Sequence, residues 1–198
     1  MTHHTMGAEH AAHAGPDVPS HDEMMLATTL LNRPAPAFKG QAYFSGFSGE
    51  GFKEISLDDY KGKWLVLFFF PAAFTGVCQS EVRAFSEELA KFEAMGAELV
   101  GASADTQFTL RQWAKSGEVG EVRYPLLSDT NHYAGAAYGV YNCPSGLNLR
   151  GLFIINPEGV VKYMVVHDSG IGRSTDETLR VLAALQSGGA CDANWRKK

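Results

Sequence analysis

Apolar runs separated by turn-forming residues divide most of this chain into short strands and amphipathic helices. Trp64–Phe70 is an unbroken apolar run of strand length that stops at Pro71, which is typical of a central strand buried on both faces. Two further strands, Ala37–Phe44 and Phe52–Leu57, flank the Gly-rich segment Ser48–Gly51. This arrangement predicts a β-hairpin ahead of the central strand.

Helical spacing of apolar residues follows the central strand. From Glu81 onward the spaced residues are Val82, Phe85, Leu89 and Phe92, and Gly96 is placed to end the helix. Near the C-terminus, Ser174–Glu177 is a capping-box sequence, so it predicts the start of a last helix. Gly188-Gly189 is expected to end that helix.

Further strands and helices are predicted in the part of the chain between Gly96 and Ser174. The expected segments are the strand Glu98–Ser103, a helix capped by Asp105 and running to about Ser116, a weaker strand at Leu126-Leu127, a helix over Thr130–Val140, and the strands Gly151–Ile155 and Val160–Val166. The tight-turn sequence Asn156–Gly159 requires antiparallel pairing, whereas crossover helices require parallel neighbours. The predicted fold class is therefore α/β and thioredoxin-like, with a central mixed β-sheet flanked by helices.

Composition predicts one folded domain with extensions. The chain has 198 residues, of which 45% are hydrophobic and 20% charged, so it can bury a core. Residues 1–28 have few large side chains and carry five of the seven histidines, which predicts a flexible His-rich extension. A solvated tail is favoured over metal scavenging because nothing there would hold ligands in a fixed geometry. We expect the domain over residues 29–187, a C-terminal tail over 188–198, and neither a metal nor a cofactor.

Net charge and cysteine content narrow the possible functions of the protein further. A net charge of −5 argues against a nucleic-acid partner or an anionic membrane surface. The longest apolar run is far below the roughly 18 residues that span a bilayer, and no signal-peptide core is visible, so we expect a cytoplasmic protein. Three cysteines without a C-x-x-C pair fit neither a disulfide-stapled domain nor a four-cysteine zinc site.

Cys78 is the candidate nucleophile. It lies just after the central strand, near the first turn of the following helix, where free backbone amides and the helix dipole favour a thiolate. Thr75 is three residues earlier, so its hydroxyl could hold an oxygen substrate, and Pro71 restricts the backbone of the intervening loop. Glu81 would oppose a thiolate unless a cation neutralises it, and Arg150 is the candidate cation.

Pro71, Thr75 and Cys78 form the pattern P-x-x-x-T-x-x-C, and the segment Phe69–Glu81 resembles the active-site loop of the peroxiredoxins. Further segments follow in that family's order: Ser103–Thr106 with Phe108 and Trp113, Arg150 before Phe153–Gly159, and Gly170–Arg173. The resemblance covers roughly residues 30–198. It implies a thiol-dependent peroxidase in which Cys78 becomes a sulfenic acid while Thr75 and Arg150 orient the peroxide.

Cys191–Trp195 is similar to the resolving segment of the typical two-cysteine branch, which includes the peroxidase component of alkyl hydroperoxide reductase. The resemblance implies that Cys191 resolves the sulfenic acid of the other protomer in a homodimer, although spacing alone leaves intra-chain and inter-chain pairing open. It also implies peroxide substrates and reduction by a disulfide reductase, either thioredoxin or an alkyl hydroperoxide reductase flavoprotein.

The chain departs from the family pattern at several positions. Phe70, Ala73 and Gln79 stand where many members have Tyr, an acidic residue and Pro. Ala73 and Phe74 lie where the family builds its higher-order interface, so both a dimer and a decamer remain open. Seven residues follow Cys191, and the Gly-Gly-Leu-Gly insertion and Tyr-Phe tail of the easily over-oxidised branch are not seen. We therefore expect resistance to sulfinic inactivation.

Rival functions have weaker support. A thioredoxin-type oxidoreductase would need C-x-x-C, but Cys78 is followed by Gln79-Ser80-Glu81. Gly170 and Gly172 lie between a strand and a helix, but the third glycine of a dinucleotide site is missing. Holdase chaperone activity is an alternative that could coexist with catalysis. Cys143 is interpreted as a spare thiol, with a second redox role as the alternative.

Overall fold

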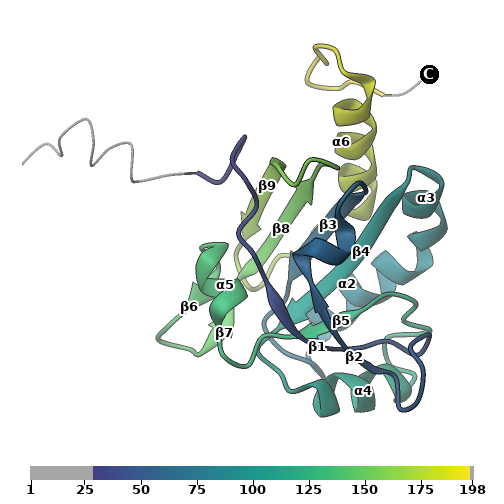
Figure 1. Cartoon of the computed structure of the whole chain (residues 1–198), viewed down its shortest axis with the longest axis vertical. Coiled ribbons are helices and arrows are strands. Elements are labelled where there is room, and N and C mark those ends of the chain that lie inside the picture. The colour runs from purple at the N-terminus through teal and green to yellow at the C-terminus, as the bar shows by residue number, and fades with distance from the viewer. Residues whose placement is uncertain (1–28, 197–198) are drawn as a thin grey trace, which may run out of the picture.

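The computed structural model describes residues 29–196. They form an α/β domain around one seven-stranded sheet, with the C-terminal helix projecting at one end (Figure 1). The proposed His-rich extension, residues 1–28, lies outside the described residues. Within 29–196, no helix is long and apolar enough to cross a membrane.

The central sheet has the order β2-β1-β5-β4-β3-β8-β9. Its strands are β1 (Lys39–Tyr43), β2 (Phe52–Ser56), β3 (Trp64–Phe69), β4 (Ala97–Ser103), β5 (Leu126–Ser128), β8 (Arg150–Ile155) and β9 (Val161–His167). β3, β4 and β5 run parallel, whereas the β1–β2, β1–β5, β3–β8 and β8–β9 pairs are antiparallel. The predicted mixed sheet and both predicted hairpins are confirmed.

β3 is buried on both faces, as its apolar run predicts. Val66 and Phe68 belong to one core cluster and Leu65, Leu67 and Phe69 to the other, since side chains alternate along a strand. The first cluster is covered by α2 (Gly76–Glu87), α3 (Leu89–Ala94), α4 (Gln107–Lys115) and α6 (Thr175–Ser187). The second is covered by η1 (Leu57–Tyr60) and α5 (Tyr133–Ala137). Helices thus flank both faces of the sheet, as expected for the thioredoxin-like class.

The structure confirms one predicted helix start and corrects another. The helix after the central strand begins at Gly76, so Cys78 lies in its first turn, as the sequence predicts. Asp105 does not cap α4: Thr106 is the N-cap and its hydroxyl accepts from the Thr109 amide at 3.2 Å. The Asp105 carboxylate instead accepts hydrogen bonds from the Ala73 amide and the Ser103 hydroxyl, and the neighbouring Thr106 caps the helix.

Two further predictions need correction in the second half of the chain. The helix expected over Thr130–Val140 is reduced to α5, and an unpredicted hairpin of β6 (Tyr141–Asn142) and β7 (Leu147–Asn148) follows it. At α6, Ser174 accepts from the Glu177 amide, but the Glu177 carboxylate binds Arg180 instead of returning to Ser174. Of the two hydrogen bonds of the predicted capping box, only the one from the Glu177 amide to the Ser174 hydroxyl is therefore present.

Aromatic packing fixes α2 against the sheet. Phe85 is fully buried and stacks on Phe68 of β3, with ring centroids 4.4 Å apart. Because α2 carries Cys78, this contact sets the depth at which the cysteine lies. We expect Phe85→Ala to lower the free energy of unfolding by about 3–5 kcal/mol through the cavity it leaves.

Urea unfolding followed by circular dichroism would measure this change. Glu87→Ala, at an exposed position of the same helix, should stay within about 0.5 kcal/mol of the unsubstituted protein. A Phe85→Ala variant as stable as the Glu87→Ala control would show that α2 does not depend on this stack.

Candidate active site

Cys78 lies where β3 passes into α2. The strand ends at Phe69, a short loop follows, and Thr75 is the N-cap of the helix with extended backbone angles. Cys78 is therefore in the first helical turn, where backbone amides lack partners within the helix. Its side chain is fully buried, and the sulfur is a free thiol. This position confirms the sequence-based placement of Cys78 at the positive end of a helix.

A buried ion cluster adjoins the Cys78 sulfur. The Arg150 guanidinium, at the start of β8, donates to Cys78 Sγ at 3.3 Å and to Glu81 Oε2 at 2.6 Å. Both side chains of the ion pair are at most 4% exposed. Arg150 is thus the cation that the sequence required beside Glu81, and it also reaches the thiol.

Arg173 is the residue that sequence reasoning missed as a functional group. Its Nε and backbone amide both donate to Glu81 Oε1 at 2.7 Å, and its Nη2 donates to Oε2 at 2.8 Å. Its Nη1 donates to the carbonyls of Phe69 and Gly151, so it also joins the ends of β3 and β8. The only sequence signal was its place in the Gly170–Arg173 segment, because 92 positions separate it from Glu81.

The two guanidinium groups keep Glu81 ionised. Burial alone would raise the pKa of Glu81, but hydrogen bonds and charge from Arg173, together with the charge of Arg150, hold that pKa below its ordinary value of 4.5. The carboxylate therefore remains an anion throughout the neutral range. It orients both arginines instead of acting as a proton donor.

The loop that precedes Cys78 is held at several points. The Phe70 amide donates to the Ala102 carbonyl at 2.9 Å, and the Ala73 amide donates to Asp105 Oδ2 at 2.8 Å. Phe74 has a positive φ of 59°, a conformation that is rare for residues other than glycine. The Thr75 hydroxyl donates to the Ala72 carbonyl at 2.8 Å. The loop is thus a constrained turn that sets the start of α2.

Aromatic rings pack behind this loop. Trp113 of α4 is fully buried, and its ring centroid lies 5.6 Å from that of Phe70 and 6.2 Å from that of Phe74. Its burial makes Trp113 a core aromatic. It backs the loop without reaching the surface.

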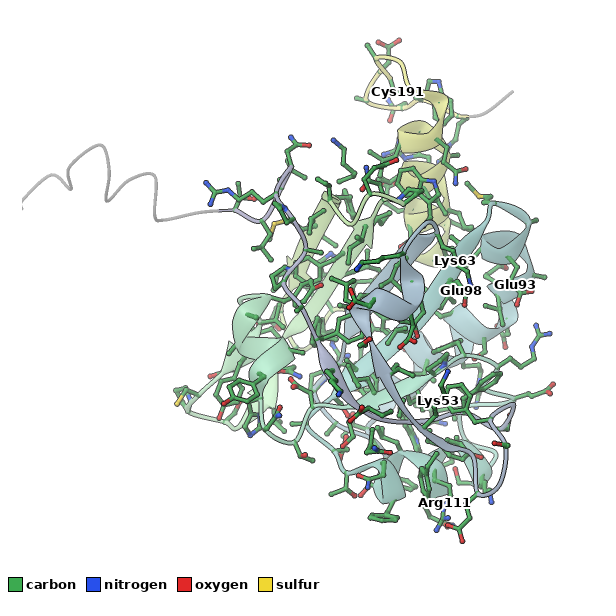
Figure 2. The ribbon with its side chains drawn as sticks, viewed as in Figure 1. Lys53, Lys63, Glu93, Glu98, Arg111 and Cys191 are labelled. Atoms are coloured by element: carbon green, nitrogen blue, oxygen red, sulfur yellow. The ribbon has the colours of Figure 1, made fainter. Side chains whose placement is uncertain are left out.

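Cys191 lies at the far end of α6 from this cluster. Arg173, which binds Glu81, comes just before α6, and the helix is 13 residues or roughly 20 Å long. The Cys191 sulfur lies 3.8 Å from the Ala184 carbonyl and 3.5 Å from the Ser187 hydroxyl, near the C-terminal end of α6. Figure 2 shows Cys191 in the loop that follows that helix. The two cysteines are therefore not brought together within one protomer.

Other sequence candidates lie away from the cluster. Cys143 is exposed in the β6–β7 hairpin. A Cβ atom added at Gly172 would lie 3.5 Å from the Glu81 side chain and 3.6 Å from that of Val77, so this glycine-containing loop lies close to α2. Across residues 29–196, no group of three or more His, Cys, Asp or Glu side chains could hold a metal ion.

Comparison with known proteins agrees with this geometry. A family model described as "AhpC/TSA family" matches residues 31–164. A peroxiredoxin of the rubredoxin operon of Clostridium pasteurianum is 45% identical over 172 residues, which cover 85% of this chain and 96% of that relative. The mitochondrial thioredoxin-dependent peroxide reductase of Drosophila melanogaster is 42% identical over 183 residues, covering 88% and 76%.

A solved structure shows the same fold. The reduced two-cysteine peroxiredoxin of Plasmodium vivax superimposes with a TM-score of 0.80 at 35% identity, covering 85% of this chain and 90% of that one. The fold and the cysteine site together define a thiol-dependent peroxidase. The chain belongs to the AhpC/TSA family, the peroxiredoxins, and its activity is that of an antioxidant oxidoreductase.

The ion cluster makes stability depend on pH. Glu81→Gln leaves two buried guanidinium groups without their anion, so we expect it to lower the free energy of unfolding by about 3–5 kcal/mol near neutral pH. Because the folded-state pKa of Glu81 is lowered, its stabilising contribution is present above 4.5 and is lost as pH falls through the folded value. The difference between the two proteins should therefore shrink in acid.

Urea unfolding at a series of pH values would follow this difference. Glu87→Gln, at an exposed position of α2, is the matched control and should show no such pH-dependent gap. A stability gap for Glu81→Gln that is constant from neutral pH to well below 4.5 would contradict the assignment of Glu81 as an ionised partner of the two arginines.

Proposed function

We propose that this chain reduces hydrogen peroxide and organic hydroperoxides with Cys78 as the peroxidatic cysteine and Cys191 as the resolving cysteine. One observation carries the first assignment: the Cys78 sulfur lies in the first turn of α2 and accepts a hydrogen bond from Arg150 at 3.3 Å. Both features favour an anionic sulfur. Of the three cysteines, all of them among the described residues, only Cys78 lies in the first turn of a helix and accepts a hydrogen bond from an arginine.

The first step is attack of the Cys78 thiolate on one peroxide oxygen. An S–O bond forms, the O–O bond breaks, and the leaving alkoxide or hydroxide takes a proton to give alcohol or water, while Cys78 becomes a sulfenic acid. In this proposal Arg150 stabilises the charge that develops on the leaving oxygen. Thr75 holds the peroxide, Pro71 shapes the loop around it, and Glu81 positions Arg150.

The second step is attack of the Cys191 thiol on the oxidised sulfur of a second protomer. An S–S bond forms, the S–O bond breaks, and water leaves. The position of Cys191 beyond the C-terminal end of α6 supports pairing between protomers, because its own Cys78 lies near the other end of that helix. A homodimer with two intersubunit disulfides satisfies this geometry, and assembly into a decamer is a further step that the proposal leaves to experiment.

An external dithiol must then reduce the disulfide. The Drosophila relative is named as a thioredoxin-dependent peroxide reductase, which supports thioredoxin as the electron donor, with an alkyl hydroperoxide reductase flavoprotein as the alternative. A cytoplasmic location is part of the proposal, since a reducing compartment returns thiols to the state that this cycle needs. Neither nucleic acid nor a membrane has a part in it.

A non-reducing gel with peptide mapping tests the pairing. After one equivalent of hydrogen peroxide, the unsubstituted protein should give a dithiothreitol-reversible dimer joined through Cys78 and Cys191, and Cys78→Ser and Cys191→Ser should each abolish it. Cys143→Ser is the matched control and should form the same dimer, because this exposed thiol has no part in the cycle. A disulfide within one chain, or one that includes Cys143, would contradict the proposed resolving step.

Arg150→Lys tests the role of the guanidinium. Lysine keeps the positive charge but loses the planar fork that reaches both Cys78 and Glu81, so we expect the rate of Cys78 oxidation by hydrogen peroxide to fall by about 10²-fold. Stopped-flow tryptophan fluorescence would measure the rate. Arg83→Lys, an exposed arginine of the same helix, should react at the unsubstituted rate. Equal rates for both variants would remove Arg150 from the reacting site.

A further inference from the structure

The peptide group between Ala72 and Ala73 has a partner at each end. Its carbonyl accepts from the Thr75 hydroxyl at 2.8 Å, and its amide donates to Asp105 Oδ2, also at 2.8 Å. The planar peptide therefore links a carboxylate just after β4 to the hydroxyl of the N-cap residue of α2. Two otherwise unrelated side chains are thus joined through one rigid group.

Asp105 is itself fixed by the ends of two parallel strands. Its Oδ2 also accepts from the hydroxyl of Ser103, the last residue of β4, at 2.9 Å. Its backbone carbonyl accepts from the hydroxyl of Ser128, the last residue of β5, at 2.7 Å. The carboxylate is half-buried and cannot follow the loop if the loop moves. It is a fixed anchor on the sheet.

We propose that Asp105 is a positioning residue for catalysis, which acts through the Ala72–Ala73 peptide to fix the direction of the Thr75 hydroxyl. This inference rests on the proposed function of Thr75 as the residue that holds the peroxide. A hydrogen bond to an ionised carboxylate is about twice as strong as a neutral one. It polarises the peptide, and the carbonyl at the other end becomes a better acceptor for the Thr75 proton.

The direction of that proton decides what Thr75 can do. With its hydrogen committed to the Ala72 carbonyl, the hydroxyl presents only oxygen lone pairs to a substrate. Thr75 then accepts a hydrogen bond from the O–H of a hydroperoxide and does not compete as a donor to the sulfur. Asp105 therefore favours the protonated peroxide as the bound form, which is the form that a thiolate can attack with loss of a leaving group.

The same contact holds the strained part of the loop. Ala73 directly precedes Phe74, whose φ of 59° is a strained backbone conformation for a non-glycine residue. The Ala73 amide bond to Asp105 fixes the chain on the N-terminal side of that residue, and Trp113 backs the Phe74 ring. Losing the anchor would let the loop relax and the hydroxyl rotate, while Cys78 stays in α2 beside Arg150.

Two reactions of Cys78 distinguish a loss of Thr75 positioning from a general disruption of the active-site structure. In this proposal, oxidation of Cys78 by hydrogen peroxide needs the Thr75 hydroxyl. Alkylation of Cys78 by iodoacetamide needs the thiolate but not that hydroxyl. We expect Asp105→Ala to slow peroxide oxidation at least about tenfold, while the alkylation rate and its pH profile stay as in the unsubstituted protein. Asp105→Asn keeps an acceptor oxygen for the Ala73 amide and should lose distinctly less. Asp58→Ala, an exposed aspartate in η1, is the matched control and should change neither rate.

A double-mutant cycle with Thr75→Val completes the test. If Asp105 acts through the Thr75 hydroxyl, Asp105→Ala should have almost no further effect on peroxide oxidation in the Thr75→Val background. Additive losses in that cycle, an unchanged peroxide rate in Asp105→Ala, or equal losses in oxidation and alkylation would each overturn the proposal. If Asp105→Ala does not fold, Asp105→Asn in the same cycle gives the coupling.

The proposed function can fail separately from this inference. An unsubstituted protein whose Cys78 is not oxidised by hydrogen peroxide would refute the peroxidase assignment itself. A reactive unsubstituted protein in which Thr75→Val has no effect would refute the role of Thr75, and Asp105 with it. Normal Thr75 dependence with no dependence on Asp105 would remove only the positioning role.

Discussion

The buried carboxylate of Glu81 is the interaction on which the rest of the site depends. It lies on α2 and binds Arg150 from β8 and Arg173 from the loop before α6, so three separate parts of the chain meet at one anion. Burying any one of these charges alone would be strongly unfavourable, and the three are stable only together. The contacts that complete the domain therefore also place a guanidinium beside the Cys78 sulfur. The carboxyl ends of the parallel strands add a rigid base, because Ser103 and Ser128 hold Asp105 beside the loop of Cys78.

Much of this arrangement could be predicted from the sequence because it depends on local patterns. The apolar run of β3, the hairpin turns and the position of Cys78 after a buried strand are local, and the need for a cation beside Glu81 follows from charge alone. The comparisons confirm the family. The resistance to sulfinic inactivation stays a prediction, and so do the catalytic roles of all six site residues: Cys78, Cys191, Thr75, Arg150, Pro71 and Glu81.

What the sequence could not supply depends on tertiary contacts. Arg173 meets Glu81 across 92 positions, and no spacing rule connects them. Asp105 has the sequence environment of a helix cap, but the Ala73 amide takes its carboxylate, so Thr106 caps α4 instead. The β6–β7 hairpin is too short and polar to give an alternating pattern. At Arg173 and Asp105, a distant partner outweighed the local preference.

The charges of the ion cluster have one more consequence. Two guanidinium groups face one carboxylate, which leaves a surplus positive charge beside the Cys78 sulfur. In the proposed cycle, a Cys78 thiolate balances this surplus charge and a neutral sulfenic acid does not. Oxidation of Cys78 in this proposed cycle therefore removes a charge partner from a buried cluster at the stage when a second thiol must reach the sulfur.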